Sequence, residues 1–214
     1  MAETRKITIE CLRYNPETDT EPVYRSYEVP FTDDMSVLQG LQYIKDNLDG
    51  SLTFRWSCRM AICGSCGKMI NGEPALSCQS FLRDYMPGPL RVEPLNHFPI
   101  VRDLAVDQSD FLEKLQSVKP WLIPKKPQPV SAGAFKQTPE QMDEYYQYSQ
   151  CINCLLCYAS CPQYGLNQKF TGPGALALGE RDPAGPPGCR AGVDLGDRGA
   201  LARVRALSAA VQRD

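Results

Sequence analysis

The sequence predicts an α+β domain followed by a smaller all-α domain. Near the N-terminus, two stretches alternate apolar and polar residues, which is typical of half-buried strands. A helical spacing of apolar residues and a further hairpin pattern follow within the first hundred residues. After that, strand patterns give way to helical ones separated by proline-rich chain. The 214 residues suit one large domain or two small ones.

The first domain is expected to span residues 1–105. Its two alternating stretches, KITIEC and VYRSYEV, are joined by the turn-rich NPETDTEP and predict a strand pair. A helix capped by Asp33 or Asp34 should follow, with its apolar face formed by Leu38, Leu41, Ile44 and Leu48. Asn71-Gly72 in KMINGEPAL marks the tip of a tight hairpin, and PLRVEPL is the last strand candidate.

The second domain is expected to span residues 106–181, with residues 182–214 as a separate tail. A first helix, stopped by Pro120, would carry the apolar residues Val106, Phe111, Leu115 and Val118. Residues 120–137 contain four prolines and predict an extended connector. Thr138, Pro139 and Gln141 then form a capping-box pattern for a helix that runs to about Tyr148 and delivers Cys151.

Charge and hydropathy exclude several classes of function. The net charge is −2, and the 23 basic and 25 acidic residues are mixed along the chain, so no nucleic-acid-binding stripe is present. No apolar run is long enough to span a membrane, and the N-terminal residues lack an apolar signal core, so export is not expected. Ten cysteines in a reducing compartment indicate metal ligands rather than disulfides.

The first cysteine cluster has the spacing Cys-x4-Cys-x2-Cys-x11-Cys, formed by Cys58, Cys63, Cys66 and Cys78. Its first three members match plant-type 2Fe-2S proteins, in which a distant fourth cysteine completes the site. Glycines follow Cys63 and Cys66, where they would let backbone N–H groups approach the cluster sulfurs. The alternative is a four-cysteine zinc site, although zinc sites usually pair two Cys-x2-4-Cys units.

The second cluster is CINCLLCYASCP, residues 151–162, with the spacing Cys-x2-Cys-x2-Cys-x3-Cys-Pro. In bacterial ferredoxin-type runs, the first three cysteines bind one cubane cluster and the fourth binds another. Each cluster therefore needs further cysteines from elsewhere in the chain.

Isolated residues carry weaker signals. His97, the single histidine, is expected to be structural, and Cys11 is expected to be a small core residue. Arg55 and Arg59 either interact with the negative charge of a cluster or are simply solvated. Because no nucleophile–base pair or phosphate loop is recognisable, the predicted chemistry is electron transfer.

The two motifs, in this order and joined by a proline-rich connector, resemble one family: the iron–sulfur subunits of the succinate dehydrogenase and fumarate reductase complexes. The stretches that carry the resemblance are RYNPETDT, YIKDNLDGSLTFRWSCRMAICGSCG, FPIVRDL, QTPEQM and CINCLLCYASCPQYGLN, and it extends over roughly residues 5–181. The wording of the cysteine motifs is closer to the fumarate reductase branch.

The resemblance implies a β-grasp 2Fe-2S ferredoxin domain, a helical bacterial-ferredoxin-like domain and three clusters. It implies that Cys58, Cys63, Cys66 and Cys78 hold a 2Fe-2S cluster near the flavin of a partner. Cys151, Cys154 and Cys157 would be ligands of a 4Fe-4S cluster, and Cys161 would be a ligand of a 3Fe-4S cluster.

The same resemblance implies an electron-transfer subunit of a membrane-associated quinol–fumarate reductase or succinate dehydrogenase, acting in anaerobic respiration or the tricarboxylic acid cycle. Single electrons would pass between quinol and the FAD of a flavoprotein subunit, with no site for fumarate on this chain. Anchor subunits that bind quinone would hold it at the cytoplasmic face of the bacterial plasma membrane as a peripheral protein.

The tail departs from the family pattern. Family members continue with Cys-x5-Cys-x3-Cys-Pro, which supplies the last 4Fe-4S ligand and two 3Fe-4S ligands, whereas after Arg181 this sequence has Cys189 alone. Gly, Ala, Pro and Arg account for 20 of the 33 tail residues, a mixture that a G/C-rich gene gives when read out of frame. We interpret the tail as a frameshift near codon 182; the alternative is a genuine divergent tail. Poor order is expected beyond about residue 170.

Two other functions stay open at this stage. A truncated, non-conducting binding module would dock on the flavoprotein without completing the 3Fe-4S centre. A zinc-stabilised structural protein would have no redox role.

Overall fold

The computed structural model describes residues 5–121, 123–124, 129–134, 136–167, 169–181 and 189–190. The chain divides into two compact units. The first contains the chain up to Gln108 together with Ile152–Gly165, and the second contains Ser109–Cys151 and the described residues after Gly165.

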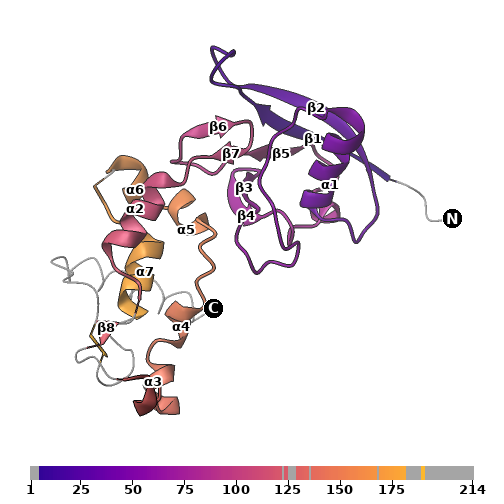
Figure 1. The fold of residues 1–214 in the computed structure, drawn as a ribbon. Helices are drawn as coiled ribbons and strands as arrows, with labels where there is room; N and C mark the ends of the chain where they lie inside the picture. The colour runs from indigo at the N-terminus through magenta and orange to yellow at the C-terminus, as the bar shows by residue number, and fades with distance from the viewer. Residues whose placement is uncertain are drawn as a thin grey trace. The chain divides into compact units, whose positions relative to one another are not determined.

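The first unit is built on a five-stranded mixed sheet with the order β2-β1-β5-β3-β4 (Figure 1). Strands β1 and β5 are parallel, and the other neighbours are antiparallel. The strands are β1 (Arg5–Arg13), β2 (Val23–Phe31), β3 (Gly67–Ile70), β4 (Glu73–Leu76) and β5 (Leu90–Glu93). This mixed sheet with one covering helix is the β-grasp arrangement and confirms the predicted α+β class.

Helix α1 (Val37–Tyr43), extended by the π-helical turn Ile44–Leu48, covers one face of the sheet (Figure 1). Its cap is Ser36, whose side chain accepts from the Gln39 amide while Gln39 reaches back to the Ser36 amide. The predicted caps, Asp33 and Asp34, therefore lie too early. The Ser-x-x-Gln pattern marks the start of the helix, because it satisfies two amides that would otherwise lack partners.

The hairpin between β3 and β4 is confirmed. Asn71 and Gly72 both have positive φ, 49° and 85°, as the tight turn between two twisted strands requires. The 3-10 turn Leu82–Tyr85 follows, and the small pair β6 (Ile100–Arg102) and β7 (Ala105–Val106) comes before the unit ends. Val106 belongs to β7 and not to the helix in which its spacing placed it.

The core of the first unit lies between the sheet and α1. Cross-strand pairs such as Ile7 with Val29 and Ile70 with Val92 set its register. Gly40 of α1 lies so close to Ile9 that an added Cβ would come within 2.9 Å of the Ile9 Cδ1 atom. The largest fully buried aliphatic side chains here are Ile9, Leu41, Ile44, Leu52, Ile70, Leu82 and Leu90.

A buried arginine at the end of β1 joins two loops. Arg13 is 7% exposed, and its Nε atom donates to the Asp103 carboxylate at 3.0 Å. Its Nη1 atom donates to Asp49 at 2.5 Å, and its Nη2 atom donates to the Ser51 hydroxyl at 2.8 Å. Hydrogen bonds from Ser51, Tyr27 and Arg13 hold the pKa of Asp49 well below its usual range. The turn that leads into the first cysteine loop is thereby fixed to the sheet.

The segment Ile152–Gly165 packs in the first unit through aromatic rings. Its helices are α5 (Leu156–Ala159) and α6 (Pro162–Leu166), which carry Tyr158 and Tyr164. The Phe98 ring lies 6.1 Å from Tyr158 and 5.6 Å from Tyr164, and the two tyrosines are 4.7 Å apart, edge to face. The structure therefore corrects the predicted division at residues 105 and 106, because this part of the expected second domain belongs to the first unit.

The second unit is helical. Its helices are α2 (Ser109–Ser117), α3 (Pro139–Asp143), α4 (Tyr146–Ser149) and α7 (Pro173–Arg181), and α7 contacts both α2 and α4. The predicted capping box of Thr138 and Gln141 is present, with Pro139 at the first helical position. The predicted helix to Tyr148 is interrupted at Tyr145, so that α3 and α4 are separate.

Poor order was expected beyond about residue 170, but the described structure continues to Arg181. Residues Pro173–Arg181 form α7, in which Ala175, Leu176 and Leu178 are buried, and Arg181 donates to the Pro120 carbonyl at 2.8 Å. Of the predicted tail, the described residues are Cys189–Arg190, strand β9, which pairs with β8 (Ile123–Pro124). The remaining tail positions lie outside the described residues, and so do both interpretations of the tail. No helix in the described part of the chain has the length and hydropathy of a membrane span.

The Arg13 cluster gives a stability test. Asp103→Asn keeps the shape and tolerates the positive φ of 48° at this position, but it disrupts acceptors for Arg13, Tyr14 and Thr53. The free energy of unfolding should fall by at least about 2 kcal/mol, because buried donors lose their partners. Urea denaturation followed by circular dichroism measures this.

The control is Glu28→Gln, which removes the exposed pair with Lys6 and should cost less than about 1 kcal/mol. Equal losses in the two variants would contradict the role given to the buried cluster.

Candidate iron–sulfur site

The loop that carries the first cysteine cluster wraps its thiols in backbone amides. The Sγ atom of Cys58 accepts from the amides of Met60 and Cys63, each at 3.4 Å. The Cys63 sulfur accepts from the Cys58 amide at 3.4 Å, and the Cys78 sulfur accepts from the Ala61 amide at 3.3 Å. Donors at these positions stabilise negative charge on sulfur.

Left-handed backbone makes this wrapping possible. Arg59 and Ala61 have φ of 63° and 58°, and Gly64 has φ of 71°. Residues of this kind, alternating with ordinary ones, turn successive N–H groups toward one side and form an anion-binding concavity. The cost of holding two non-glycine residues in this region marks the loop as functionally constrained.

The fourth cysteine is brought to the loop by the end of β4. Both the amide and the hydroxyl of Ser77 donate to the Cys66 carbonyl, at 3.2 and 2.9 Å. These two bonds bring the end of β4, and with it Cys78, to the Cys66 backbone. The sequence therefore needs the hairpin at Asn71-Gly72 to bring a cysteine twelve positions away back to the loop.

The thiols differ in their acidity. The Cys58 amide lowers the pKa of Cys63 to about 6. Burial raises the pKa of Cys78 to about 11. Metal binding deprotonates either kind of thiol. The difference therefore has two causes, hydrogen bonds that stabilise the Cys63 thiolate and burial that disfavours the Cys78 thiolate.

The Cys58 and Cys63 sulfurs each accept from the backbone amide of the other residue. The Cys78 sulfur accepts from the Ala61 amide of the same loop, and the Ser77 bonds to the Cys66 carbonyl lie beside it. These four cysteines are the number that a 2Fe-2S cluster takes.

An apolar rim surrounds the loop. Met60 and Ile62 are 65% and 64% exposed, and Trp56 is 40% exposed. Arg59 lies over the Trp56 ring with its guanidinium carbon 4.5 Å from the ring centre. Arg55 instead donates to the side chain of Gln108. We refer to Trp56, Met60 and Ile62 as the loop rim.

The second motif repeats the backbone device of the first. Asn153 and Leu155 have φ of 54° and 66° on either side of Cys154. Cys157 lies in α5 and is exposed, and Cys161 follows α5 and is half-buried. Cys151 belongs to the second unit, because the division falls directly after it.

The two cysteine motifs meet backbone to backbone. A Cβ added to Gly64 would lie 2.5 Å from the Ile152 carbonyl oxygen and 2.8 Å from the Cys154 Cα atom. One added to Gly67 would lie 2.9 Å from the Cys154 carbonyl oxygen. Glycine at these two positions therefore does more than admit N–H donors, because it lets the second motif reach the first loop.

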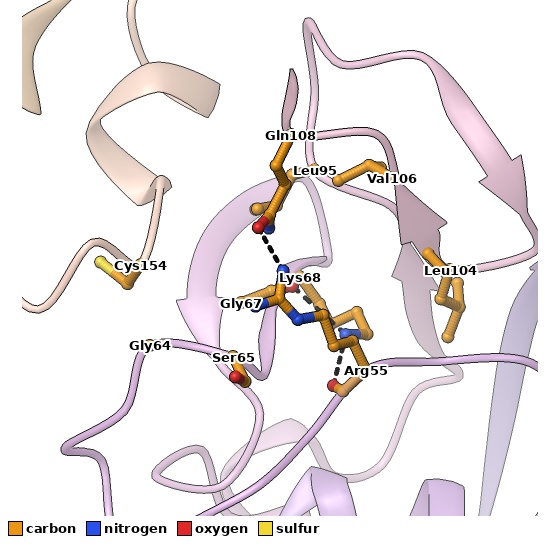
Figure 2. A pocket seen from close by; sticks show the side chains of 11 residues that line it. Arg55, Gly64, Ser65, Gly67, Lys68, Leu95, Leu104, Val106, Gln108 and Cys154 are labelled. Carbon is orange, nitrogen blue, oxygen red and sulfur yellow. Dashed lines mark hydrogen bonds between the residues drawn. The ribbon is translucent and has the colours of Figure 1, made fainter. Parts of the chain in front are cut away.

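One residue of the site is absent from the sequence predictions. Lys68 is 1% exposed, and its Nζ atom donates to the carbonyls of Arg55 and Gly67, each at 3.3 Å (Figure 2). Burial lowers its pKa to about 8, which leaves it a cation at pH 7. The signal in the sequence was slight: a lysine inside the short strand that follows CGSCG.

Cys11 and His97, the isolated residues of the sequence analysis, lie in different environments. Cys11 is fully buried in the core, as predicted, and burial raises the pKa of its thiol to about 12. His97 is exposed, has φ of 70°, and lies edge-on to Tyr164. An added Cβ on Gly165 would come within 2.4 Å of the His97 ring, so the histidine covers α6 in a structural role.

Comparison with known proteins defines the class first. Residues 8–113 match the family described as the 2Fe-2S iron-sulfur cluster binding domain. The β-grasp unit with its cysteine loop is therefore a 2Fe-2S domain.

Similar whole chains narrow the identification. The fumarate reductase iron-sulfur subunit of Mycobacterium tuberculosis is 52% identical over 205 residues, covering 96% of this chain and 79% of the relative. That of Escherichia coli O157:H7 is 54% identical over 181 residues, covering 85% and 73%. A solved structure of the Mycobacterium smegmatis Sdh1 complex in the apo form is similar with a TM-score of 0.77 and 27% identity, covering 94% of this chain and 81% of that one.

The chain belongs to the family of iron–sulfur subunits of fumarate reductase and succinate dehydrogenase, which are the electron-transfer subunits of these oxidoreductases. The match to the Mycobacterium tuberculosis subunit covers 205 residues of this chain, and the tail begins after residue 181. The match therefore includes positions in the tail.

The contact between the motifs can be tested with alanine at Gly64. The same substitution at Gly72 is the matched control, because Gly72 also has positive φ but has no atom within 4 Å of an added Cβ. Each variant should lose about 1 kcal/mol of unfolding free energy from backbone strain. Gly64→Ala should lose a further ~1–3 kcal/mol from the clash with Ile152 and Cys154. Urea midpoints of the two variants measure the difference, and equal midpoints would count against the contact.

Proposed function

We propose that this chain relays single electrons between quinol and the flavin of a partner flavoprotein, as the iron–sulfur subunit of a fumarate reductase or succinate dehydrogenase. The observation that carries the proposal is the cysteine loop, in which backbone amides donate to the sulfurs of Cys58, Cys63 and Cys78. Family membership supplies the reaction.

The 2Fe-2S ligands are assigned to Cys58, Cys63, Cys66 and Cys78. When bound, the cluster supplies one-electron chemistry without proton transfer. The residues around it hold the thiolates in place: the amides of Met60, Cys63 and Ala61 donate to sulfur, and the Ser77 bonds position the fourth ligand. The donated hydrogen bonds favour the reduced state, because they offset added negative charge.

The second motif is assigned to the other two centres of the family. Cys151, Cys154 and Cys157 would be three ligands of a 4Fe-4S cluster, and Cys161 would be one ligand of a 3Fe-4S cluster. These are four of the seven thiolates that the two clusters take in the family, and Cys189 is the remaining cysteine after the motif. The described residues thus fit a complete 2Fe-2S set and a partial set for the other two.

The partners follow from the same assignment. The exposed loop rim is the surface that the flavoprotein would cover, because it is apolar and surrounds the cysteines. Membrane anchor subunits would bring quinone, which places the chain as a peripheral protein at the cytoplasmic face of the bacterial plasma membrane. The Sdh1 complex to which this chain is similar supports an assembly of this kind.

A second function rests on the thiolate count. A chain that holds the 2Fe-2S cluster but leaves the 3Fe-4S ligand set incomplete would dock on the flavoprotein without conducting to quinone. Electron paramagnetic resonance separates the two: an oxidised 3Fe-4S signal supports the relay, and its absence beside an intact 2Fe-2S signal supports the binding module.

The ligand assignment predicts a defined loss. Cys63→Ser should abolish or alter the 2Fe-2S signal of the dithionite-reduced protein, because it removes one of the four assigned thiolate ligands. Cys11→Ala, in the core, should leave the signal intact. Spectroscopy together with iron and acid-labile sulfide analysis measures both. Zinc without sulfide in the unmodified protein would refute the redox assignment altogether.

The loop rim predicts where the flavoprotein binds. Ile62→Asp should weaken association with the flavoprotein at least tenfold without loss of the 2Fe-2S signal, because it places a charge in the apolar contact. Val23→Asp is the control, since Val23 is also exposed, at 46%, but lies at the start of edge strand β2. Association measured by surface plasmon resonance should be unchanged in the control, and a similar loss in both variants would argue against the rim.

A further inference from the structure

Lys68 is placed on the core side of a central strand. Side chains alternate along β3, so Lys68 lies on the same face as Ile70, which belongs to the main core. All four residues of β3 are buried. A lysine is rarely fully buried unless an opposite charge accompanies it.

Lys68 follows the assigned ligand Cys66 by two residues, and its Nζ atom donates to the carbonyl of Gly67, the residue between them. Its Nζ atom contacts two carbonyl oxygens at 3.3 Å, which solvate the ammonium only in part. Burying an unpaired cation is strongly unfavourable even after the surrounding structure relaxes. In the described part of the chain, the compensating negative charge is thus to be sought at the cysteine loop, two residues before Lys68.

The space beside Lys68 is too small for a ligand. The cavity measures about 10 Å³ and is lined by residues of both cysteine motifs, including Gly64, Gly67 and Cys154 (Figure 2). No substrate or cofactor fits there, so the ammonium is not a binding group for one. Its position puts a fixed positive charge beside the contact between the two motifs.

We propose that Lys68 is a positioning residue whose buried charge balances the thiolate-bound 2Fe-2S centre and raises its reduction potential. The inference rests on the ligand assignment under the proposed function. Reduction adds one negative charge to the centre, and a nearby buried cation stabilises that charge more than water would.

The test is a redox titration of the full chain, prepared anaerobically with its iron and sulfide. Lys68→Met keeps the length of the side chain but removes the charge, and Lys68→Arg keeps the charge. The ratio of reduced to oxidised 2Fe-2S centre, read by electron paramagnetic resonance at fixed ambient potential, should fall about tenfold in Lys68→Met. It should stay near the wild-type value in Lys68→Arg.

Lys45→Met is the matched control. The Lys45 ammonium also donates to two carbonyls, those of Gly50 and Leu52, but the residue is exposed. Its loss removes similar hydrogen bonds and should leave the potential unchanged, because water screens the charge. An unchanged potential in Lys68→Met, or an equal shift in Lys45→Met, would overturn the proposal.

Failure of assembly is also informative. If Lys68→Met does not bind the 2Fe-2S centre, the same redox titration is made on Lys68→Gln, which is also neutral but has a polar side chain. If neither neutral variant assembles the centre but Lys68→Arg does, the charge is needed and the proposal stands. If Lys68→Arg fails with them, side-chain shape and not charge is required, and the proposal falls. A wild-type chain without a 2Fe-2S signal would instead refute the proposed function itself.

Discussion

The contact of Gly64 and Gly67 with the backbone of Ile152–Cys154 is the constraint on which the site depends. Neither glycine could carry a side chain without striking main-chain atoms, which cannot move aside as a flexible side chain can. This approach joins the second cysteine motif to the β-grasp unit, although 84 positions separate Gly67 from Cys151 in sequence. The aromatic group of Phe98, Tyr158 and Tyr164 then fills the space around it.

The same region carries the positive charge of the site. Residues of both motifs line a cavity of about 10 Å³, and Lys68 is one of the lining residues. Its ammonium group donates to two carbonyl oxygens. Left-handed residues in the first motif accompany amides that donate to the thiols, so positive partial charges lie around these cysteines. An electron-transfer site needs this arrangement, because its charge changes while its geometry must not.

Local chemistry was predictable from the sequence, and packing between distant segments was not. The turn at Asn71-Gly72 and the cap at Thr138 depend on neighbouring residues alone, and both are present. The cap of α1 was misplaced although Ser36 and Gln39 carry the pattern, because two aspartates nearby offered a competing one. The inclusion of Ile152–Gly165 in the first unit depends on contacts with glycines that lie 85 or more residues away in sequence, and no local pattern reveals such contacts.

Hydrogen exchange of the full chain tests most directly whether the two motifs form one unit. Amides of the loop around Gly64–Gly67 and of α5 should exchange through the same opening, with protection that rises and falls together across urea concentrations. Rapid exchange of Ile152–Gly165 beside a protected β-grasp sheet would contradict the account, because the second motif would then open independently of the first.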